Sequence, residues 1–305
     1  MEIILSICVV TMNRASQLNE ALESCLACEL PKETEFIIVD NASTDQTEQV
    51  VTELFQAHQY SYIYEKLDKN LGCGGGRNYA FTQAKGKYIY ALDDDAIIDT
   101  KKNRLFFEEA IAILNKYHDI VSLTTQIYDT AWKANRLSGN KIKYAENLYK
   151  LKMFCGGSHF LRKDFFSFPP YFNNKYGFEE ILPSLQIADK GMINAFAPDL
   201  KIIHKPLIDK WNKKDKANES ILINECVVQY TLKKMFYPII FMPLIWFAYH
   251  RRCKKYLNDV ENLRSKARKV ICETMEANLV QYKIKTKTVI QMYKDFGISI
   301  FNRRR

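Results

Sequence analysis

The stretch that decides the fold reads Lys87-Tyr-Ile-Tyr-Ala-Leu-Asp93-Asp94-Asp95-Ala-Ile-Ile98. Its apolar part, residues 88–92, is rich in strand-forming residues and too short for a helix of about ten residues or more, so it predicts a buried β-strand. Three adjacent carboxylates follow at the carboxyl end of this strand, where open α/β sheets bind ligands. Such anions repel one another unless they are compensated, and a hard divalent ion that holds a phosphate compensates them naturally. The alternative is a solvated acidic turn that caps the next helix.

The chain before this stretch alternates between predicted strands and predicted helices. The predicted strands are residues 3–11, 35–40 and 60–64, and the predicted helices are residues 15–28 and 46–57. A glycine-rich turn, Asn70 to Asn78, then leads into a helix that ends at Ala84. This alternation predicts an α/β fold with a Rossmann-like, mostly parallel sheet and helices on both faces. The glycine-rich turn alone is a weak signal, because a dinucleotide fingerprint would directly follow the first strand.

Length and composition set the outer bounds of the interpretation. The 305 residues are 47% hydrophobic, enough for one large α/β domain with an appendage and a real core. The eight cysteines form no framework, and the pair Cys25 and Cys28 lacks a second pair or a nearby histidine for a zinc site. The N-terminus does not resemble a signal peptide, so we expect a protein of the reducing cytoplasm.

Positive charge is concentrated in the C-terminal third of the chain. Residues 201–305 carry 23 of the 44 Lys and Arg but only 9 of the 35 Asp and Glu. Within this third, residues 235–249 contain no charge and are followed at once by four basic residues, Arg251, Arg252, Lys254 and Lys255. The uncharged run is too short to span a bilayer as a helix. It suits either a segment that lies in the headgroups of an anionic leaflet or a helical hairpin packed on protein.

Four separated motifs, taken together, resemble the inverting glycosyltransferase family 2, whose members have the GT-A fold. They are residues 6–14, 38–45, 70–78 and 92–95, and the resemblance covers about residues 3–205. It implies a GT-A catalytic domain over residues 1–210, with a nucleotide-sugar-binding half (1–100) and an acceptor-binding half (101–210). Residues 211–305 would then form a basic, helical C-terminal region that associates with a membrane or forms oligomers.

The resemblance also assigns roles to individual residues. Thr11, Asp40 and Arg77 are expected to contact the base and ribose of the donor, and Asp93 and Asp95 are the ends of the DxD motif. The full set of donor-binding residues implied in this way is Thr11, Asn13, Arg14, Asp40, Arg77, Asp93, Asp94, Gly156 and Gly157. Asp95, Asp93 and His204 are the expected ligands of Mn²⁺ or Mg²⁺. For His204 the alternative is an ordinary surface histidine beside a lysine.

The segment around Gly156 and Gly157 resembles the small-residue stretch that lines the sugar in this family, although a β-bulge would also explain the glycines. Further on, Glu179 and Glu180 match the family's Glu-Asp pair. Glu180 would be the catalytic base and Glu179 would orient the acceptor. The alternative is an acidic pair that favours a helix N-terminus. Two further positions of the family pattern differ here, because Leu182 replaces an Asp and Gln186 replaces an Arg.

These expectations combine into one function hypothesis. The chain would be an inverting, metal-dependent glycosyltransferase that uses a UDP-, dTDP- or GDP-linked sugar. The acceptor would be a hydroxyl of a cell-surface glycan or a lipid-linked oligosaccharide, as in polysaccharide biosynthesis. The Asp40-Asn41 pair resembles the subset that uses rhamnose or galactofuranose donors. Residues 235–255 would hold the enzyme at the cytoplasmic face of the cell membrane or serve as a homodimer surface.

Two other functions compete with this hypothesis. A sugar-phosphate nucleotidylyltransferase also uses a doubly wound sheet and a divalent ion, but it needs a glycine-rich phosphate loop after the first strand, where this chain has residues 11–14. A catalytically silent scaffold that binds nucleotide-sugars is the other alternative, because two charged positions of the family pattern are lost. No nucleic-acid partner is expected, since no recognised module is present and the N-terminal part is acidic.

Overall fold

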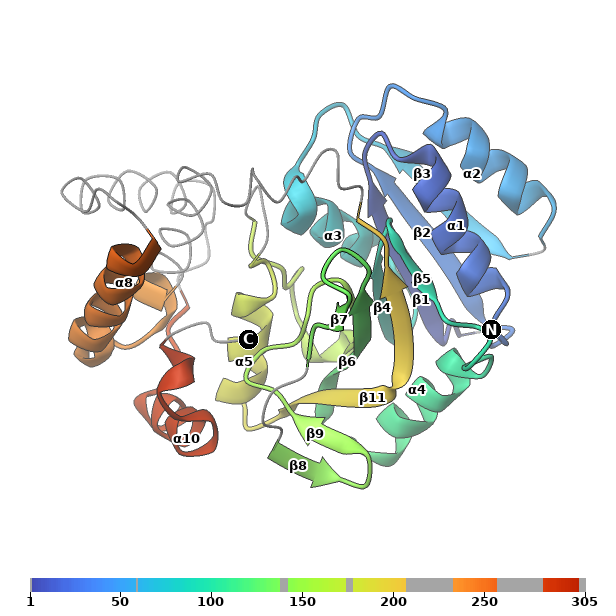
Figure 1. The fold of residues 1–305 in the computed structure, drawn as a ribbon. Helices are drawn as coiled ribbons and strands as arrows, with labels where there is room; N and C mark the ends of the chain where they lie inside the picture. Colours follow the sequence, from blue (N-terminus) through green and yellow to red (C-terminus); the bar gives the residue numbers. More distant parts are fainter. Residues whose placement is uncertain are drawn as a thin grey trace. The chain divides into compact units, whose positions relative to one another are not determined.

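The computed structural model describes residues 2–58, 60–137, 142–173, 178–206, 233–256 and 282–301. The chain divides into two compact units. The first comprises residues 1–187 and 192–206, and the second comprises residues 188–191 and 207–305. The first unit contains the strands of the sheet, and the second contributes helices (Figure 1).

The predicted strands of the N-terminal half are present and parallel. They are β1 (Leu5–Thr11), β2 (Thr34–Asp40), β3 (Ser61–Lys66) and β4 (Tyr88–Asp93). They lie side by side in the order β3-β2-β1-β4, and all their pairings are parallel. The apolar, β-branched sequence of β1 and β2 suits strands buried on both faces, and both are almost wholly buried.

Beyond β4 the sheet becomes mixed. Its further strands are β5 (Ala96–Ile98), β6 (Ile120–Asp129), β7 (Ala134–Asn135), β8 (Ile142–Ala145), β9 (Leu148–Lys150), β10 (Ser158–Arg162) and β11 (Ile193–His204). The order continues β4-β10-β6-β11-β9-β8, with β10 antiparallel to both neighbours and β6 parallel to β11. The parallel sheet expected from the sequence therefore describes the first four strands, and the expected α/β fold is confirmed.

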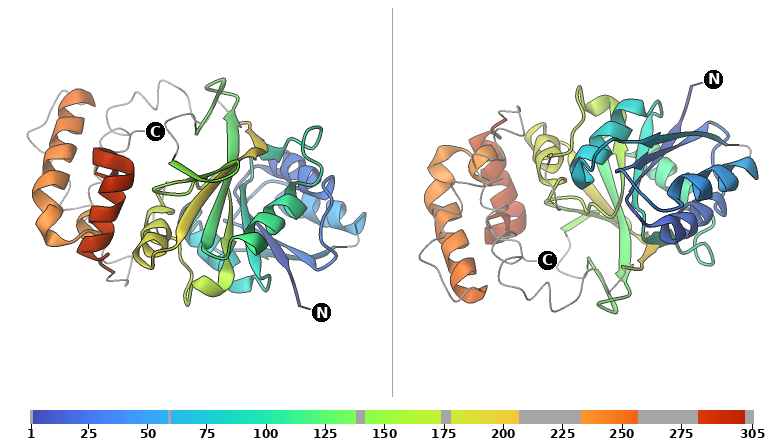
Figure 2. Two further views of the ribbon diagram at one scale, coloured as in Figure 1. Left: turned by 90° about the horizontal axis from the view of Figure 1, so that it is seen from below. Right: turned by 90° about the horizontal axis from the view of Figure 1, so that it is seen from above.

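Helices cover both faces of the sheet, as the alternating pattern predicts. They are α1 (Ala15–Leu26), α2 (Thr47–Gln56), α3 (Gly72–Gln83), α4 (Phe106–Lys116) and α5 (Ile181–Asp189), with a short turn of helix, η1 (Lys163–Phe165). Ile7 and Val9 of β1 pack in one core with α1, α2 and α4, whereas Cys8 packs in another with α3. Figure 2 shows this layering from two further directions. The period of two along β1 thus serves both cores.

The glycine-rich segment differs from the prediction, because its glycines lie inside α3 and not in a turn before it. A Cβ atom at Gly76 would come 2.5 Å from Cγ1 of Val10, and one at Gly74 would collide with the carbonyl oxygen of Phe172. The glycines therefore let the helix approach β1 and the loop near Phe172 closely. Local composition indicated a turn, whereas the requirement comes from tertiary packing.

An aromatic cluster fixes β4 and with it the three aspartates. The Tyr90 ring centroid lies 4.4 Å from that of Phe160 on β10 and 5.3 Å from that of Phe107 on α4. The Tyr90 hydroxyl shares a 2.8 Å hydrogen bond with Ser158, so its one polar atom is satisfied in the core. Strand β4 is thereby held from the helical side and from its neighbouring strand.

The second unit contains η2 (Ile239–Phe241), α8 (Met242–Tyr256), α10 (Thr286–Phe296) and η3 (Gly297–Ile300). Asp189 accepts hydrogen bonds from the Lys285 amide at 2.7 Å and from the Thr288 and Tyr282 hydroxyls at 2.6 and 2.7 Å, which ties down the start of α10. The sequence also predicts a helix over residues 219–234, of which only the last two residues lie within the described part. In the described residues, no helix has the length and apolar composition needed to cross a bilayer.

The aromatic cluster gives a test of the packing around β4. Replacing the fully buried Phe160 with Ala should lower the free energy of unfolding of the first unit by about 3–5 kcal/mol, because a cavity opens in the core. Urea unfolding followed by circular dichroism measures this change. The matched control is Phe168→Ala, since Phe168 is 79% exposed and its loss should cost less than about 0.5 kcal/mol. Equal losses in the two variants would contradict the packing.

Candidate active site

Five strands deliver polar side chains to one edge of the sheet. Thr11, Asp40, Asp93, Asp129 and His204 are the last residues of β1, β2, β4, β6 and β11. Strands β1, β2 and β4 are mutually parallel; β6 runs in the same direction as β4 because both are antiparallel to β10, and β11 is parallel to β6. All five carboxyl ends therefore point the same way, which is the edge where α/β sheets bind ligands.

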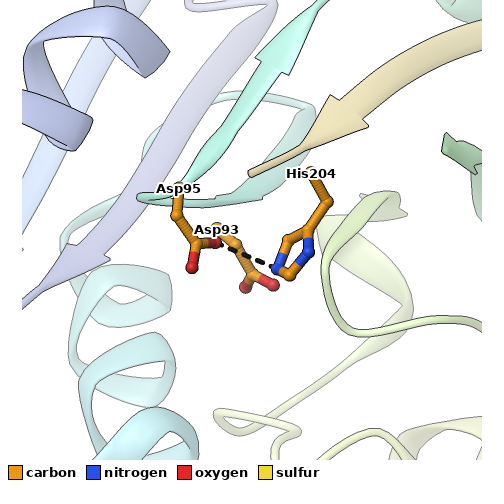
Figure 3. Close-up of side chains that lie close together, drawn as sticks. All are labelled: Asp93, Asp95 and His204. Carbon is orange, nitrogen blue, oxygen red and sulfur yellow. Dashed lines mark ion pairs between the residues drawn. The ribbon is translucent and has the colours of Figure 1, made fainter. Parts of the chain in front are cut away.

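Asp93, Asp95 and His204 form a candidate metal centre (Figure 3). One possible ligand atom from each residue lies within 4.8 Å of the others. Nε2 of His204 is 3.1 Å from a carboxylate oxygen of Asp95, and both side chains are more than nine-tenths buried. Two carboxylates and an imidazole are donors that suit Mn²⁺ or Mg²⁺. The three residues predicted as metal ligands thus lie together, although nearly 110 residues separate the aspartates from the histidine in the sequence.

The middle aspartate turns away from this group and braces the first strand. Asp94 accepts a 2.8 Å hydrogen bond from the hydroxyl of Thr11 and a 2.8 Å ion-paired hydrogen bond from Arg14. The same Nη1 atom of Arg14 lies 2.9 Å from Asp95. Burial, opposed by the charge of Arg14, raises the pKa of Asp94 to about 6. Thr11, Arg14 and Asp94 therefore form one connected group directly beside the candidate metal centre.

The predicted residues on β2 and the preceding loop are held by backbone and side-chain hydrogen bonds. Asp40 is fully buried and accepts hydrogen bonds from the Ser43 amide at 2.7 Å and the Tyr64 hydroxyl at 2.5 Å. Asn13 has a left-handed backbone conformation (φ 52°), and its side-chain oxygen accepts a 2.7 Å hydrogen bond from the Thr44 amide. These bonds fix the loops after β1 and β2 against each other.

Arg77 connects the two halves of the first unit. Its buried guanidinium donates to Asp93 at 2.6 Å and to the carbonyl of Gly156 at 2.7 Å, and it also forms an ion pair with Glu179. The carboxylate of Glu179 is buried, and its Oε2 atom has no hydrogen-bond partner among the described residues. A buried acceptor without a partner is costly. An acceptor of this kind is suited to a hydroxyl group of a ligand.

Gly156 and Gly157 lie where charged side chains converge, immediately before β10 and not in a bulge of it. A Cβ atom on Gly156 would be 3.0 Å from Oε1 of Glu179 and 3.8 Å from Oε2 of Glu180. One on Gly157 would be 2.9 Å from Oδ2 of Asp93. The absence of side chains on the two glycines therefore lets the backbone lie close to the acidic pair and to Asp93 of the candidate metal centre.

Two residues of the site were missed by the sequence analysis, Asp129 and Arg136. Asp129 Oδ2 lies 3.2 Å from Nδ1 of His204 and accepts hydrogen bonds from Nε and Nη2 of Arg136 at 3.2 and 3.0 Å. Burial pushes the pKa of Asp129 upward, but Arg136 and His204 outweigh it, so that this pKa lies below its ordinary value. A signal for Asp129 existed, because it follows an apolar strand just as Asp40 and Asp93 do. Arg136 carries no comparable local signal.

Comparison with known proteins was made on the sequence and on the fold. Residues 6–168 match the model of Glycosyl transferase family 2. Poly(ribitol-phosphate) beta-N-acetylglucosaminyltransferase TarS of Staphylococcus aureus is 32% identical over 120 residues, or 39% of this chain and 20% of TarS. A Methanocaldococcus jannaschii protein named as an uncharacterized glycosyltransferase is 28% identical over 213 residues, or 68% of this chain and 63% of that protein. This chain thus spans only about a fifth of TarS.

Solved structures of glycosyltransferases share the fold. Residues 1–349 of Staphylococcus aureus TarS in complex with UDP-GlcNAc match with a TM-score of 0.59 and 16% identity, covering 98% of this chain and 89% of that one. GalNAc-T7 with UDP, GalNAc and Mn²⁺ matches with a TM-score of 0.62 and 16% identity, covering 90% and 56%. A Pyrobaculum calidifontis mannosyltransferase with GDP-Man and Mn²⁺ matches with a TM-score of 0.56 and 14% identity, covering 98% and 81%.

The candidate metal centre predicts which histidine supports metal binding. His204→Gln should weaken Mn²⁺ binding at least about tenfold, since it removes an imidazole nitrogen from the group of three possible ligands. Free Mn²⁺ measured by electron paramagnetic resonance during a titration reports the affinity. His118→Gln is the matched control, because His118 is exposed. The metal assignment is wrong if both variants bind Mn²⁺ as tightly as the wild type.

Proposed function

The chain belongs to glycosyl transferase family 2, and we propose that it moves a sugar from a nucleoside diphosphate to a hydroxyl group with inversion, in a metal-dependent reaction. The observation that carries this proposal is the convergence of two acidic groups in one unit. Asp93 belongs to the candidate metal centre and is also linked through Arg77 to Glu179, which is followed directly by Glu180. The first group suits a divalent ion that holds a diphosphate, and the second group suits the attacking hydroxyl. The family match favours this function over the nucleotidylyltransferase expected as its main competitor.

The donor site would lie at the ends of β1, β2 and β4. Thr11, Asn13, Asp40 and Arg14 belong to the loops that would receive the nucleoside and its phosphates. The donor would be a UDP-, dTDP- or GDP-linked sugar, and support comes from related folds that hold UDP-GlcNAc and GDP-Man. Arg77 is fully engaged with protein groups, so we assign it to positioning Asp93 and Glu179 instead of contacting the base.

Asp93, Asp95 and His204 would hold Mn²⁺ or Mg²⁺. When bound, such an ion neutralises the charge that builds on the diphosphate leaving group. Mn²⁺ accompanies UDP and GalNAc in one structure with this fold and GDP-Man in another. Arg14 lies 2.9 Å from Asp95 and would add positive charge on the side of β1.

Glu180 would act as the base. Its carboxylate would accept the proton of the acceptor hydroxyl while the oxygen attacks the anomeric carbon and the bond to the diphosphate breaks on the opposite face. Glu179, held by Arg77, has the free buried oxygen Oε2, which would accept a hydrogen bond from a sugar hydroxyl and so orient it. Gly156 has no side chain, so its backbone can lie close to both carboxylates.

The acceptor would be a hydroxyl of a cell-surface glycan or a lipid-linked oligosaccharide, at the cytoplasmic face of a membrane. Support comes from the second unit, where four exposed residues follow one another at helical spacing. They are Ile240 in η2 and Leu244, Phe247 and Arg251 in α8. Ile239 adds to this apolar surface with 78% exposure. Apolar residues that end in a cationic position suit the headgroup region of an anionic leaflet.

The catalytic proposal is tested on the base. Glu180→Gln should slow release of nucleoside diphosphate about 100-fold or more when the enzyme is incubated with Mn²⁺ and UDP-, GDP- or dTDP-linked sugars, with water in place of the acceptor. Donor affinity should stay within a few fold, because the amide keeps the shape of the side chain. Product release is followed by chromatography.

Glu108→Gln is the control for this experiment, because Glu108 is exposed on α4 and remote in sequence from the acidic pair. It should turn over donor like the wild type. A Glu180→Gln enzyme with unchanged turnover would remove this residue from the mechanism. If the wild type releases no nucleoside diphosphate from any donor, the proposed transfer reaction itself is contradicted.

The membrane proposal is tested on the apolar surface of the second unit. Replacing Ile240 and Phe247 together with Glu should reduce co-sedimentation with phosphatidylglycerol vesicles at least about tenfold, since two apolar side chains lose their burial. Phe168→Glu changes an equally exposed residue of the first unit and should leave vesicle binding unchanged. If the wild-type protein does not bind vesicles and the double substitution dissociates a dimer, this surface is a homodimer contact instead.

A further inference from the structure

Arg136 lies beside the candidate metal centre but is not one of its possible ligands. Its Nη2 atom is 2.9 Å from Nδ1 and 3.2 Å from Nε2 of His204. Its Nη1 atom would be 3.2 Å from a Cβ atom on Gly157, and the same Cβ position is 2.9 Å from Oδ2 of Asp93. The guanidinium therefore lies close to His204 and Asp93, two of the three possible metal ligands.

Asp129 fixes this arginine in place. It accepts hydrogen bonds from Nε and Nη2 of Arg136, and its other oxygen accepts the amides of Ala131 and Trp132, which closes the turn after β6. The guanidinium carbon also lies 5.6 Å from the centre of the Trp132 ring. These contacts use one edge of the guanidinium. Nη1 donates to no described residue, and the side chain is 20% exposed, so this nitrogen is free to meet a ligand.

The charge balance of the site calls for such a cation. With a divalent ion, the two carboxylates of Asp93 and Asp95 already neutralise the metal. A diphosphate adds at least two further negative charges, which the metal alone leaves uncompensated. Arg77 is committed to Asp93 and Glu179, so its charge is already used. Arg14 and Arg136 are the partly exposed guanidiniums next to the metal ligands among the described residues, each 20% exposed.

The order of the strands indicates which phosphate each arginine meets. Arg14 follows β1, next to β2 and Asp40, where the nucleoside is expected. Arg136 follows β7, which pairs with β6 on the other side of β4 and β10. Its Nη1 atom would be 3.2 Å from a Cβ atom on Gly157, and a Cβ atom on the neighbouring Gly156 would be 3.8 Å from Oε2 of Glu180. Arg136 therefore belongs to the end of the site where the sugar and the base meet. The phosphate at this end is the one that carries the sugar.

We propose that Arg136, held by Asp129, binds the distal phosphate of the donor and stabilises it as the leaving group. This inference rests on the proposed function, because it requires a nucleoside diphosphate in the site. Arg136 donates hydrogen bonds to the phosphate oxygens, and their negative charge grows as the bond to the sugar breaks. Asp129 is a positioning residue that acts through Arg136 and His204.

The test compares two ligands that differ by one phosphate. UDP and UMP, GDP and GMP, and dTDP and dTMP are titrated by calorimetry in saturating Mn²⁺. Arg136→Gln should lower the affinity for the diphosphate at least about tenfold, because only the diphosphate reaches this arginine. The affinity for the monophosphate should stay within about twofold. Arg136→Lys keeps the charge but loses the bidentate donor geometry of the guanidinium, so the affinity for the diphosphate should fall by an intermediate factor. The lysine variant also decides the question if the glutamine variant does not fold.

Arg104→Gln is the matched control, because Arg104 is a surface arginine paired with Glu29. This substitution should change the affinity for neither ligand. Mn²⁺ affinity without nucleotide is measured in parallel and should not fall in Arg136→Gln. The assignment of Arg136 is overturned if the affinities for diphosphate and monophosphate fall equally or if neither falls. A loss of Mn²⁺ affinity in Arg136→Gln would also overturn it. A wild type that binds none of the diphosphates would overturn the proposed function, and this inference with it.

Discussion

The burial of several carboxylates at one edge of the sheet is the constraint on which the rest of the site depends. Uncompensated buried anions are costly, so each must be paired or hydrogen-bonded. Three arginines meet this requirement in different places: Arg14 braces Asp94 and Asp95, Arg77 joins Asp93 to Glu179, and Arg136 holds Asp129. Such pairs contribute more to a defined geometry than to stability. The cations divide the acidic edge into separate positions, and the group of Asp93, Asp95 and His204 lies between them.

Much of this arrangement follows from simple rules of the chain. An apolar strand that ends in a carboxylate predicts a residue at the ligand-binding edge, and that rule located Asp40 and the three aspartates after β4 from the sequence alone. The same rule applies to Asp129, but the sequence analysis assigned no strand to residues 120–129. Its direction becomes clear once β10 is known to be antiparallel to both β4 and β6. Antiparallel insertion of a single strand is not visible in local sequence, and so Asp129 was missed.

Other features depend on contacts that no local pattern encodes. The glycines of α3 were read as a turn because glycine disfavours helices, whereas Gly74 and Gly76 are needed where the helix meets Phe172 and Val10. Arg136 follows the short strand β7, and only the fold brings it to His204, 68 residues later. Arg77 stays a predicted donor-binding residue, and its buried contacts with Asp93 and Glu179 are created only by the fold. For Arg77 and the glycines of α3, the sequence indicated that the residues matter but not what they contact, and for Arg136 it indicated neither.

The acceptor side of the site shows how the acidic pair can persist while its surroundings change. In the family pattern an Asp and an Arg occupy the positions of Leu182 and Gln186, which are four residues apart on α5 and so lie on the same face of the helix. Losing only one of the two would leave an unpaired charge near Glu180. Losing both keeps the balance, and Leu182 is buried as an apolar residue. The two replacements therefore remove opposite charges without altering the net charge near Glu180, the proposed base.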